Sequence, residues 1–145
     1  MIIPDVNLIL YAHNEEDPDH EEAVLWWDQL LSGTQAVGIP LVVVMAFLRL
    51  STSTRLFLRP LSVDQSIMRI ESWFACPQVR MIEPSPEHLS EFLRMVRSIG
   101  VAGNLTTDAH IAALSLEYRA EIHSADADFG RFPGIRWRNP LARKK

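Results

Sequence analysis

Four aspartates are placed where side chains could do chemistry. Asp126 and Asp128, in the stretch "SADADFGRF" (124–132), follow the apolar run "AEIH". Asp5 ends the segment "MIIPD", and Asp108 follows the loop "AGNLTT". Sites in open α/β sheets form beyond the carboxyl ends of the strands, so these acids could meet there. Each acid taken alone also has an ordinary interpretation as a helix N-cap or a turn residue.

Convergence of these carboxylates would require something positive beside them. Two carboxylates about 4 Å apart repel by roughly 4 kcal/mol at an effective dielectric constant near 20, whereas a helix dipole offsets only about 0.3–1 kcal/mol. The only lysines are Lys144 and Lys145, and no arginine near these segments is an obvious candidate for burial beside the acids. Sites rich in carboxylate oxygen suit Mg²⁺ or Mn²⁺. The sequence therefore favours a metal site if the acids meet.

Composition indicates a soluble globular protein. The 145 residues fit a single domain spanning 1–145, and 48% hydrophobic with 22% charged residues is ordinary for such a domain. Cys76 is the only cysteine, so no internal disulfide can form and a cytoplasmic location is expected. No apolar run approaches the ~20 residues that span a bilayer. The sequence also lacks a glycine-rich loop with a phosphate-binding lysine.

The net charge of −4 is unevenly distributed. The stretch "EEDPDHEE" (15–22) is interpreted as the start of a helix, with Asp17 or Asp19 as its N-cap. From Arg131 to Lys145 there are six basic residues and no acid. This end of the chain is either a solvated tail or one wall of a polyanion site.

Short apolar segments alternate with segments of helical periodicity. This alternation predicts an α/β fold with a mostly parallel sheet and helices on both faces. We expect Gly33 and Gly100 to end helices, and Thr107 to cap the last one. The expected strands are 1–5, 36–40 (strand or turn), 79–83, 120–124 and 134–137, and the expected helices are 6–13, 19–32, 41–51, 63–75, 86–99 and 108–119.

Three segments resemble the PIN-domain ribonucleases, and most closely the VapC-type toxins of bacterial toxin–antitoxin pairs. They are "PDVNLILYA" (4–12), "LTTDAHIAALSLEY" (105–118) and "HSADADFGRFPGIRWRNPL" (123–141). The segment "VGIPLVVVMAFLRLST" (37–52) resembles the third helix of that family. The resemblance implies a three-layer α/β/α sandwich, a carboxylate cluster that binds Mg²⁺ or Mn²⁺, and cleavage of structured RNA such as tRNA or rRNA.

The resemblance also implies roles for particular residues. Asp5, Asp108 and Asp126 match the catalytic acids that face the metal. Asn7 matches the polar residue that supports the first aspartate. Ser124 stands where the family usually has threonine or serine, hydrogen-bonded near the acids.

One position departs from the family pattern. The family usually carries a glutamate three residues before an arginine in the third helix; here the arginine is Arg49 and the matching position is Ala46. The loss removes one negative charge, and we hypothesise that Asp128, an alternative or supporting catalytic acid, compensates. Arg49 is either an RNA phosphate contact or a surface charge.

The resemblance further implies a cognate antitoxin of the VapB type, an RNA substrate and a homodimer. Trp26 and Trp27 are adjacent on one helix, so we expect one of them at a dimer or antitoxin surface. The five histidines lack metal-ligand spacing and are interpreted as surface or partly buried residues. The alternative function is a PIN-fold binding module weakened in catalysis. A phosphoacceptor receiver domain is disfavoured because it needs a lysine at a late strand end, and this chain has no lysine outside its last two residues.

Overall fold

Five short strands form one sheet in the computed structural model, which describes residues 1–141. Arg143, Lys144 and Lys145, from the basic end of the chain, lie outside the described residues. The strands are β1 (Ile2–Pro4), β2 (Val37–Pro40), β3 (Val79–Ile82), β4 (Glu121–His123) and β5 (Arg136–Arg138). Their order is β3-β2-β1-β4-β5, and every pairing is parallel, which confirms the expected parallel sheet.

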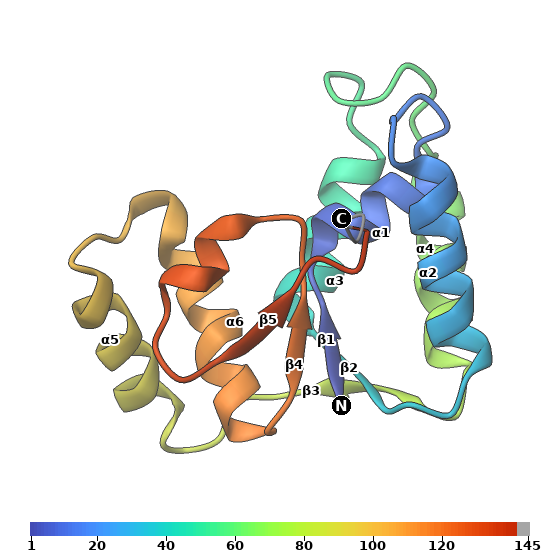
Figure 1. The fold of residues 1–145 in the computed structure, drawn as a ribbon. Helices are drawn as coiled ribbons and strands as arrows, with labels where there is room; N and C mark the ends of the chain where they lie inside the picture. The colour runs from blue at the N-terminus through green and yellow to red at the C-terminus, as the bar shows by residue number, and fades with distance from the viewer. Residues whose placement is uncertain (142–145) are drawn as a thin grey trace.

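Helices cover both faces of this sheet (Figure 1), as the sequence predicts. Helices α1, α2 and α4 lie to one side of the sheet, and α5 and α6 lie to the other. None of the helices within residues 1–141 combines the length and the apolar character needed to cross a bilayer. The helices are α1 (Val6–His13), α2 (His20–Ser32), α3 (Leu41–Ser51), α4 (Val63–Phe74), α5 (His88–Ile99) and α6 (Thr106–Glu117), with 3₁₀ turns η1 (Gly103–Leu105) and η2 (Ala127–Arg131).

Most helix ends follow local sequence signals. Ser62 and Gln65 form a capping box that begins α4, and Gly100 ends α5 in the left-handed conformation at φ 72°. Thr107 is not an N-cap, and that expectation was wrong. The turn η1 carries the chain directly into α6 at Thr106, so Thr107 lies inside the first turn of the helix.

Three of the four tryptophans, Trp26, Trp27 and Trp73, belong to the core together with His123. Trp26 and Trp27 are both buried, with 8% and 4% of their surface exposed, so the expectation that one lies at a partner surface was wrong. Trp27 packs edge-on against Trp73 with ring centroids 5.4 Å apart. The indole nitrogen of Trp26 donates a 3.0 Å hydrogen bond to Nδ1 of His123. His123 is itself fully buried, which corrects its interpretation as a surface or partly buried residue.

The order in which strands are added to the sheet reverses at its centre, between β1 and β4. The chain passes from β1 to β2 to β3 and then returns through α5 and α6 to β4, on the other side of β1. Within the β1–β4 pair, Pro4 lies opposite His123. The next residues, Asp5 and Ser124, therefore emerge side by side at the carboxyl edge, where ligand sites form in such sheets.

Candidate functional site

Asp5 is held at the end of β1 by backbone and side-chain contacts. Its backbone N–H donates to the carbonyl of His123 at 2.9 Å. Its Oδ1 accepts from the Val6 N–H at 2.8 Å, so Asp5 is the N-cap of α1. The residue is 8% exposed. The N-cap interpretation is therefore correct, and it leaves the other carboxylate oxygen facing β4.

Ser124 connects the segments after β1 and β4. Its hydroxyl donates a 2.6 Å hydrogen bond to Oδ2 of Asp5. The hydroxyl oxygen of Ser124 also accepts from the side-chain nitrogen of Asn7 at 3.2 Å and from the backbone N–H of Asp126 at 3.0 Å. One donor and two acceptor positions are all that a serine hydroxyl offers. Ser124 is thus fully engaged, and it brings together Asp5, Asn7 and the turn that carries Asp126.

Asn7 supports the same junction from α1. Its side-chain oxygen accepts from the Leu8 N–H at 2.7 Å and from the Ala125 N–H at 3.4 Å. With the bond to Ser124, the amide spans the two segments that follow β1 and β4. Asn7 and Ser124 therefore lie where the sequence predicts, beside the first aspartate.

Asp126 and Asp128 differ in setting. Oδ1 of Asp126 accepts from the Asp128 N–H at 2.9 Å and caps the short turn η2, which matches the turn interpretation. Asp126 is half-buried, whereas Asp128 is exposed. An Asp128 oxygen lies 3.9 Å from the guanidinium of Arg131, one 3₁₀ turn later. Asp128 thus lies at the outer edge of the acidic group.

Asp108, in the first turn of α6, shows that the acids converge. Its pKa is raised to about 7, first by burial and then by the negative charges of Asp5, Asp126 and Asp128; a hydrogen bond to Asp126 adds to the effect. Burial also raises the pKa of Asp5, opposed by its hydrogen bonds to Ser124 and Val6, and the charge of Asp126 raises it further. Aspartates from three separate segments therefore share one electrostatic environment, as the sequence predicts.

No basic side chain among residues 1–141 neutralises the charges of the three inner acids, Asp5, Asp108 and Asp126. Among residues 1–141, no ion pair joins Asp5, Asp108 or Asp126 to a basic side chain. Within the same range, no three His, Cys, Asp or Glu side chains are already arranged to hold a metal ion. The carboxylates thus gather at one place without forming a closed ligand set.

Ala46 and Arg49 lie on α3, across a cavity from the first turn of α6. Both line a cavity of about 450 Å³ together with Thr107, the residue before Asp108. Ala46 is partly buried, and Arg49 is exposed. Arg49 forms no ion pair with any described acid. The space where the family usually carries a glutamate is therefore open, with a free cation at its edge.

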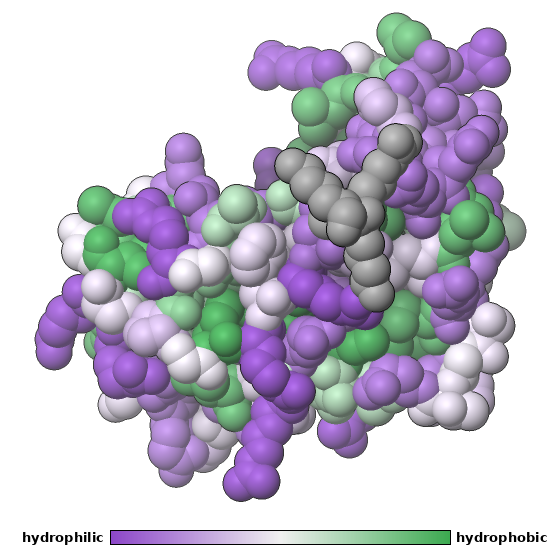
Figure 2. All heavy atoms as spheres, in the orientation of Figure 1, coloured by the Kyte–Doolittle hydropathy of each residue, from purple (hydrophilic) through white to green (hydrophobic). Residues whose placement is uncertain are grey.

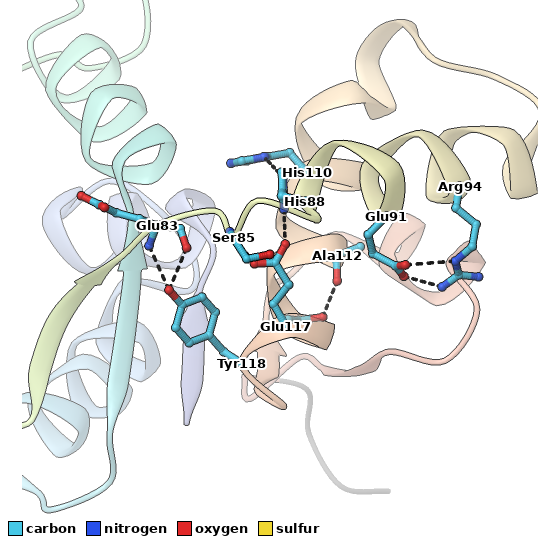
Figure 3. A network of polar contacts seen from close by, with 10 residues as sticks. Glu83, Ser85, His88, Glu91, Arg94, His110, Ala112, Glu117 and Tyr118 are labelled. Carbon is cyan, nitrogen blue, oxygen red and sulfur yellow. Dashed lines mark hydrogen bonds and ion pairs between the residues drawn. The ribbon is translucent and has the colours of Figure 1, made fainter.

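One polar network was missed by sequence reasoning. Glu117, His88 and His110 form a chain of hydrogen bonds between α5 and α6 (Figure 3). His88 is buried, which corrects its interpretation as a surface or partly buried residue. The two histidines are 22 positions apart on different helices, and no spacing rule links such residues before the helices are packed.

One protein family matches most of this chain. The family model described as "PIN domain" matches residues 2–135, and the chain belongs to the PIN-domain family. Within that family the chain is similar to ribonuclease VapC37 of Mycobacterium tuberculosis, with 42% identity over 98% of this chain and 99% of that protein. Ribonuclease VapC33 of the same organism is 40% identical over 97% of this chain and 99% of its own length.

Solved structures support the same fold at lower sequence identity. The FitAB complex bound to a DNA fragment contains a chain with a TM-score of 0.70 and 17% identity, covering 100% of this chain and 99% of that one. VapBC2 of Rickettsia felis, also bound to DNA, gives a TM-score of 0.66 and 16% identity over 96% and 98% of the two chains. At these identities the likeness establishes the α/β sandwich alone.

Proposed function

We propose that this protein is a metal-dependent endoribonuclease, the toxin of a type II toxin–antitoxin pair, acting in the cytoplasm on structured RNA such as tRNA or rRNA. The observation that carries the proposal is the convergence of Asp5, Asp108 and Asp126, with the pKa of Asp108 raised to about 7. The names of the full-length relatives, ribonucleases of the VapC type, point to the same chemistry.

The chemistry of these side chains fits Mg²⁺ or Mn²⁺. The converging groups are carboxylates, which are the ligands these hard cations prefer, and no basic side chain in residues 1–141 competes for the three inner acids. A cation would also relieve the repulsion that raises the pKa of Asp108. Asp5, Asp108 and Asp126 are the residues that would hold it.

The protein's own groups have defined tasks in this proposal. When bound, the cation supplies Lewis-acid polarisation of the scissile phosphate and lowers the pKa of an attacking water. Ser124 and Asn7 hold Asp5 in position, and one of the three carboxylates orients the water. The water oxygen bonds to phosphorus as the bond from phosphorus to the 3′ oxygen breaks, which leaves a 5′-phosphate and a 3′-hydroxyl. In this proposal Arg49 contacts a neighbouring phosphate.

A toxin requires restraint, so we also propose a VapB-like antitoxin as partner, together with a homodimer. Exposed hydrophobic side chains provide surface for such contacts. On the face shown in Figure 2 they appear at the top, over the loop after α3, and at the upper left, over the segment between α5 and α6. Around the α3–α4 connection the exposed residues are Leu56, Leu58, Val63, Ile67 and Met68.

The decisive experiment is cleavage of total bacterial RNA by the purified, partner-free protein with Mg²⁺, Mn²⁺ or EDTA, beside Asp5→Asn. Metal-dependent cuts at few sites, lost in Asp5→Asn, are expected. A folded protein that cuts no RNA with either metal would overturn the proposal. That result would favour the second candidate, a PIN-fold binding module, which Ala46 in place of the usual glutamate supports.

A further inference from the structure

The last strand, β5, contacts the site although it contributes no acid to it. β5 lies at one edge of the sheet, parallel to β4 (Figure 1), and has an arginine on each side of Trp137. The indole nitrogen of Trp137 donates a 3.1 Å hydrogen bond to the backbone carbonyl of Ser124. The hydroxyl of Ser124 in turn donates to Asp5. Trp137 is therefore linked to the acidic group through Ser124.

Pro140 explains why a side chain supplies this hydrogen bond. The backbone N–H of Ser124 donates to the carbonyl of Arg138 at 3.2 Å. If the parallel ladder continued, the next bond would run from the N–H of residue 140 to the carbonyl of Ser124. Residue 140 is a proline and has no N–H. Ser124 is fully buried, and a buried carbonyl without a donor costs free energy. The indole of Trp137 supplies the donor that the backbone lacks.

The carbonyl that Trp137 binds belongs to the peptide group between Ser124 and Ala125. The N–H of the same peptide group donates to the side-chain oxygen of Asn7 at 3.4 Å. In a planar trans peptide group the C=O and the N–H point in opposite directions. Two side chains therefore hold this group from opposite sides, Asn7 from α1 and Trp137 from β5.

The orientation of this peptide plane decides where Asp126 lies. Asp126 follows Ala125 directly, and its N–H reaches back to the hydroxyl of Ser124 at 3.0 Å. The plane turns about two backbone bonds, ψ of Ser124 and φ of Ala125. A rotation about either bond would move Asp126 relative to Ser124, and therefore relative to Asp5. The two contacts to the peptide group thus fix how these two acids approach each other.

The ring of Trp137 contacts the same segment further along the chain. A Cβ atom placed on Gly130, in η2, would lie 3.6 Å from Cζ3 of Trp137, an ordinary van der Waals distance. The ring therefore lies against η2, the turn that the side chain of Asp126 caps. Trp137 contacts the segment 124–130 at its first residue through the N–H and at its last residue through the ring.

We propose that Trp137 is a positioning residue of the site, which holds Asp126 through the Ser124–Ala125 peptide group in the arrangement that binds the cation. The inference rests on the proposed metal-dependent function. Trp137 itself contacts neither the cation nor the RNA. Because Asn7 holds the other side of the same peptide group, loss of either side chain releases the plane.

A tryptophan that only fills space at the edge of the sheet would behave differently. Its replacement would lower the free energy of unfolding, but the folded protein would keep the same peptide orientation and the same affinity for the cation. The test therefore needs readouts from the folded protein, one of them without metal.

Two variants, Trp137→Phe and Trp137→Met, remove the indole N–H and keep a large apolar side chain. Trp27→Phe is the matched control: it also removes an indole, and Nε1 of Trp27 is buried without a hydrogen-bond partner among residues 1–141. Asn7→Ala releases the other side of the peptide group, alone and together with Trp137→Phe. Urea unfolding of each variant defines the conditions in which it is folded.

Amide hydrogen exchange and Mn²⁺ binding are then measured on the folded proteins. Exchange of the Ala125 and Asp126 amides is followed by NMR in EDTA, relative to the Ile122 amide of β4 in the same protein. This ratio separates local opening of the turn from global unfolding. The Kd for Mn²⁺ is measured by titration calorimetry.

Both Trp137 variants should exchange the Ala125 and Asp126 amides about tenfold faster relative to Ile122. Their Kd for Mn²⁺ should rise about 3–10-fold, less than the 10–100-fold typical of a side chain that contacts a metal ligand directly. Trp27→Phe should lose stability and keep both values. The effects of Asn7→Ala and Trp137→Phe on the Kd should combine to less than their product, because both act on one peptide group.

Unchanged exchange and unchanged Mn²⁺ affinity in both Trp137 variants overturn the proposal. Faster exchange with unchanged affinity makes Trp137 a structural support alone and overturns its positioning role. Effects of Asn7→Ala and Trp137→Phe that multiply overturn the shared peptide group. A wild type that binds no Mn²⁺ contradicts the proposed function itself, and the exchange in EDTA still decides whether Trp137 holds the turn.

Discussion

The hydroxyl of Ser124 donates a 2.6 Å hydrogen bond to Oδ2 of Asp5, although 119 positions separate the two residues in sequence. Both are buried, at 0% and 8% exposure. The other oxygen of Asp5 accepts from the Val6 N–H. Each oxygen of Asp5 thus accepts one hydrogen bond from the described residues, and a carboxylate oxygen has capacity for a further contact. This relationship orients the carboxylate and leaves room for a cation.

Replacing Ser124 with alanine should disturb the whole junction. Ser124→Ala removes the donor to Asp5 and the acceptor for Asn7 and for the Asp126 N–H. We expect the free energy of unfolding to fall by about 1–3 kcal/mol and RNA cleavage to fall about 10–100-fold. Urea unfolding and a cleavage time course measure the two effects. Ser124→Thr, which keeps the hydroxyl, is the control, and a fully active Ser124→Ala would show that the junction is dispensable.

Asp108 should make the metal-free protein less stable as the pH rises. Its pKa is about 7 in the folded state against 3.8 for a free aspartate. Between these values the native state retains a proton that the unfolded chain has released, so stability falls as pH increases through that window. Because Asp108 is only about half-buried, solvent screening limits the loss to about 1–2 kcal/mol.

The measurement is urea unfolding in EDTA at several pH values from about 4.5 to 8. Asp108→Asn should be more stable than the wild type at the upper end, and the difference should shrink toward the lower end. Asp64→Asn, an exposed first-turn acid of α4, is the matched control and should show no such trend. If the difference in free energy of unfolding between the wild type and Asp108→Asn does not change with pH, the raised pKa of Asp108 is contradicted.

Local signals in the sequence predicted most of the elements. The helices 6–13 and 41–51 have the predicted bounds, because a strand-end acid and Pro40 mark their starts. Thr107 was misplaced because η1 has no distinct local signal, and its 3₁₀ turn brings the helix start forward to Thr106. Trp26 was misjudged because neighbouring helix positions suggest different faces, whereas α2 packs deeply enough to bury both tryptophans.

The candidate site was only partly accessible from the sequence. Strand ends and the family resemblance suggested that Asp5, Asp108 and Asp126 could meet, and in the structure the charges of Asp5 and Asp126 act on Asp108 and raise its pKa. Their roles as catalytic and metal-binding residues stay predictions. The chain of Glu117, His88 and His110 could not be foreseen, because it depends on how α5 and α6 pack rather than on any local pattern.

Asp128 should matter more than its exposure suggests if it compensates for Ala46. Its charge already raises the pKa of Asp108, so it acts on the same cation-binding region. We expect Asp128→Ala to weaken Mn²⁺ binding and slow cleavage by about 3–10-fold, since one nearby charge is worth about 1 kcal/mol at partial exposure. Isothermal titration with Mn²⁺ and single-turnover cleavage provide the readouts.

A double-mutant cycle separates compensation from a general effect. Ala46→Glu in the Asp128→Ala background should restore metal binding. The effects of the two single changes on metal binding should therefore not be additive. If Asp128→Ala leaves both metal binding and cleavage unchanged, the compensation hypothesis fails.

Cation binding should stabilise the folded protein, because the acids converge only in the native state. A ligand that binds the native state alone adds about 2.7 kcal/mol at a concentration one hundred times its Kd, which corresponds to a rise in Tm of several degrees for a chain of this size. We therefore expect Mg²⁺ or Mn²⁺ to raise the Tm relative to EDTA in the wild type and in Asp64→Asn, and much less in Asp5→Asn. Equal shifts in all three proteins would mean that the cation binds elsewhere, and the acidic group would then lose its proposed role even if RNA cleavage were observed.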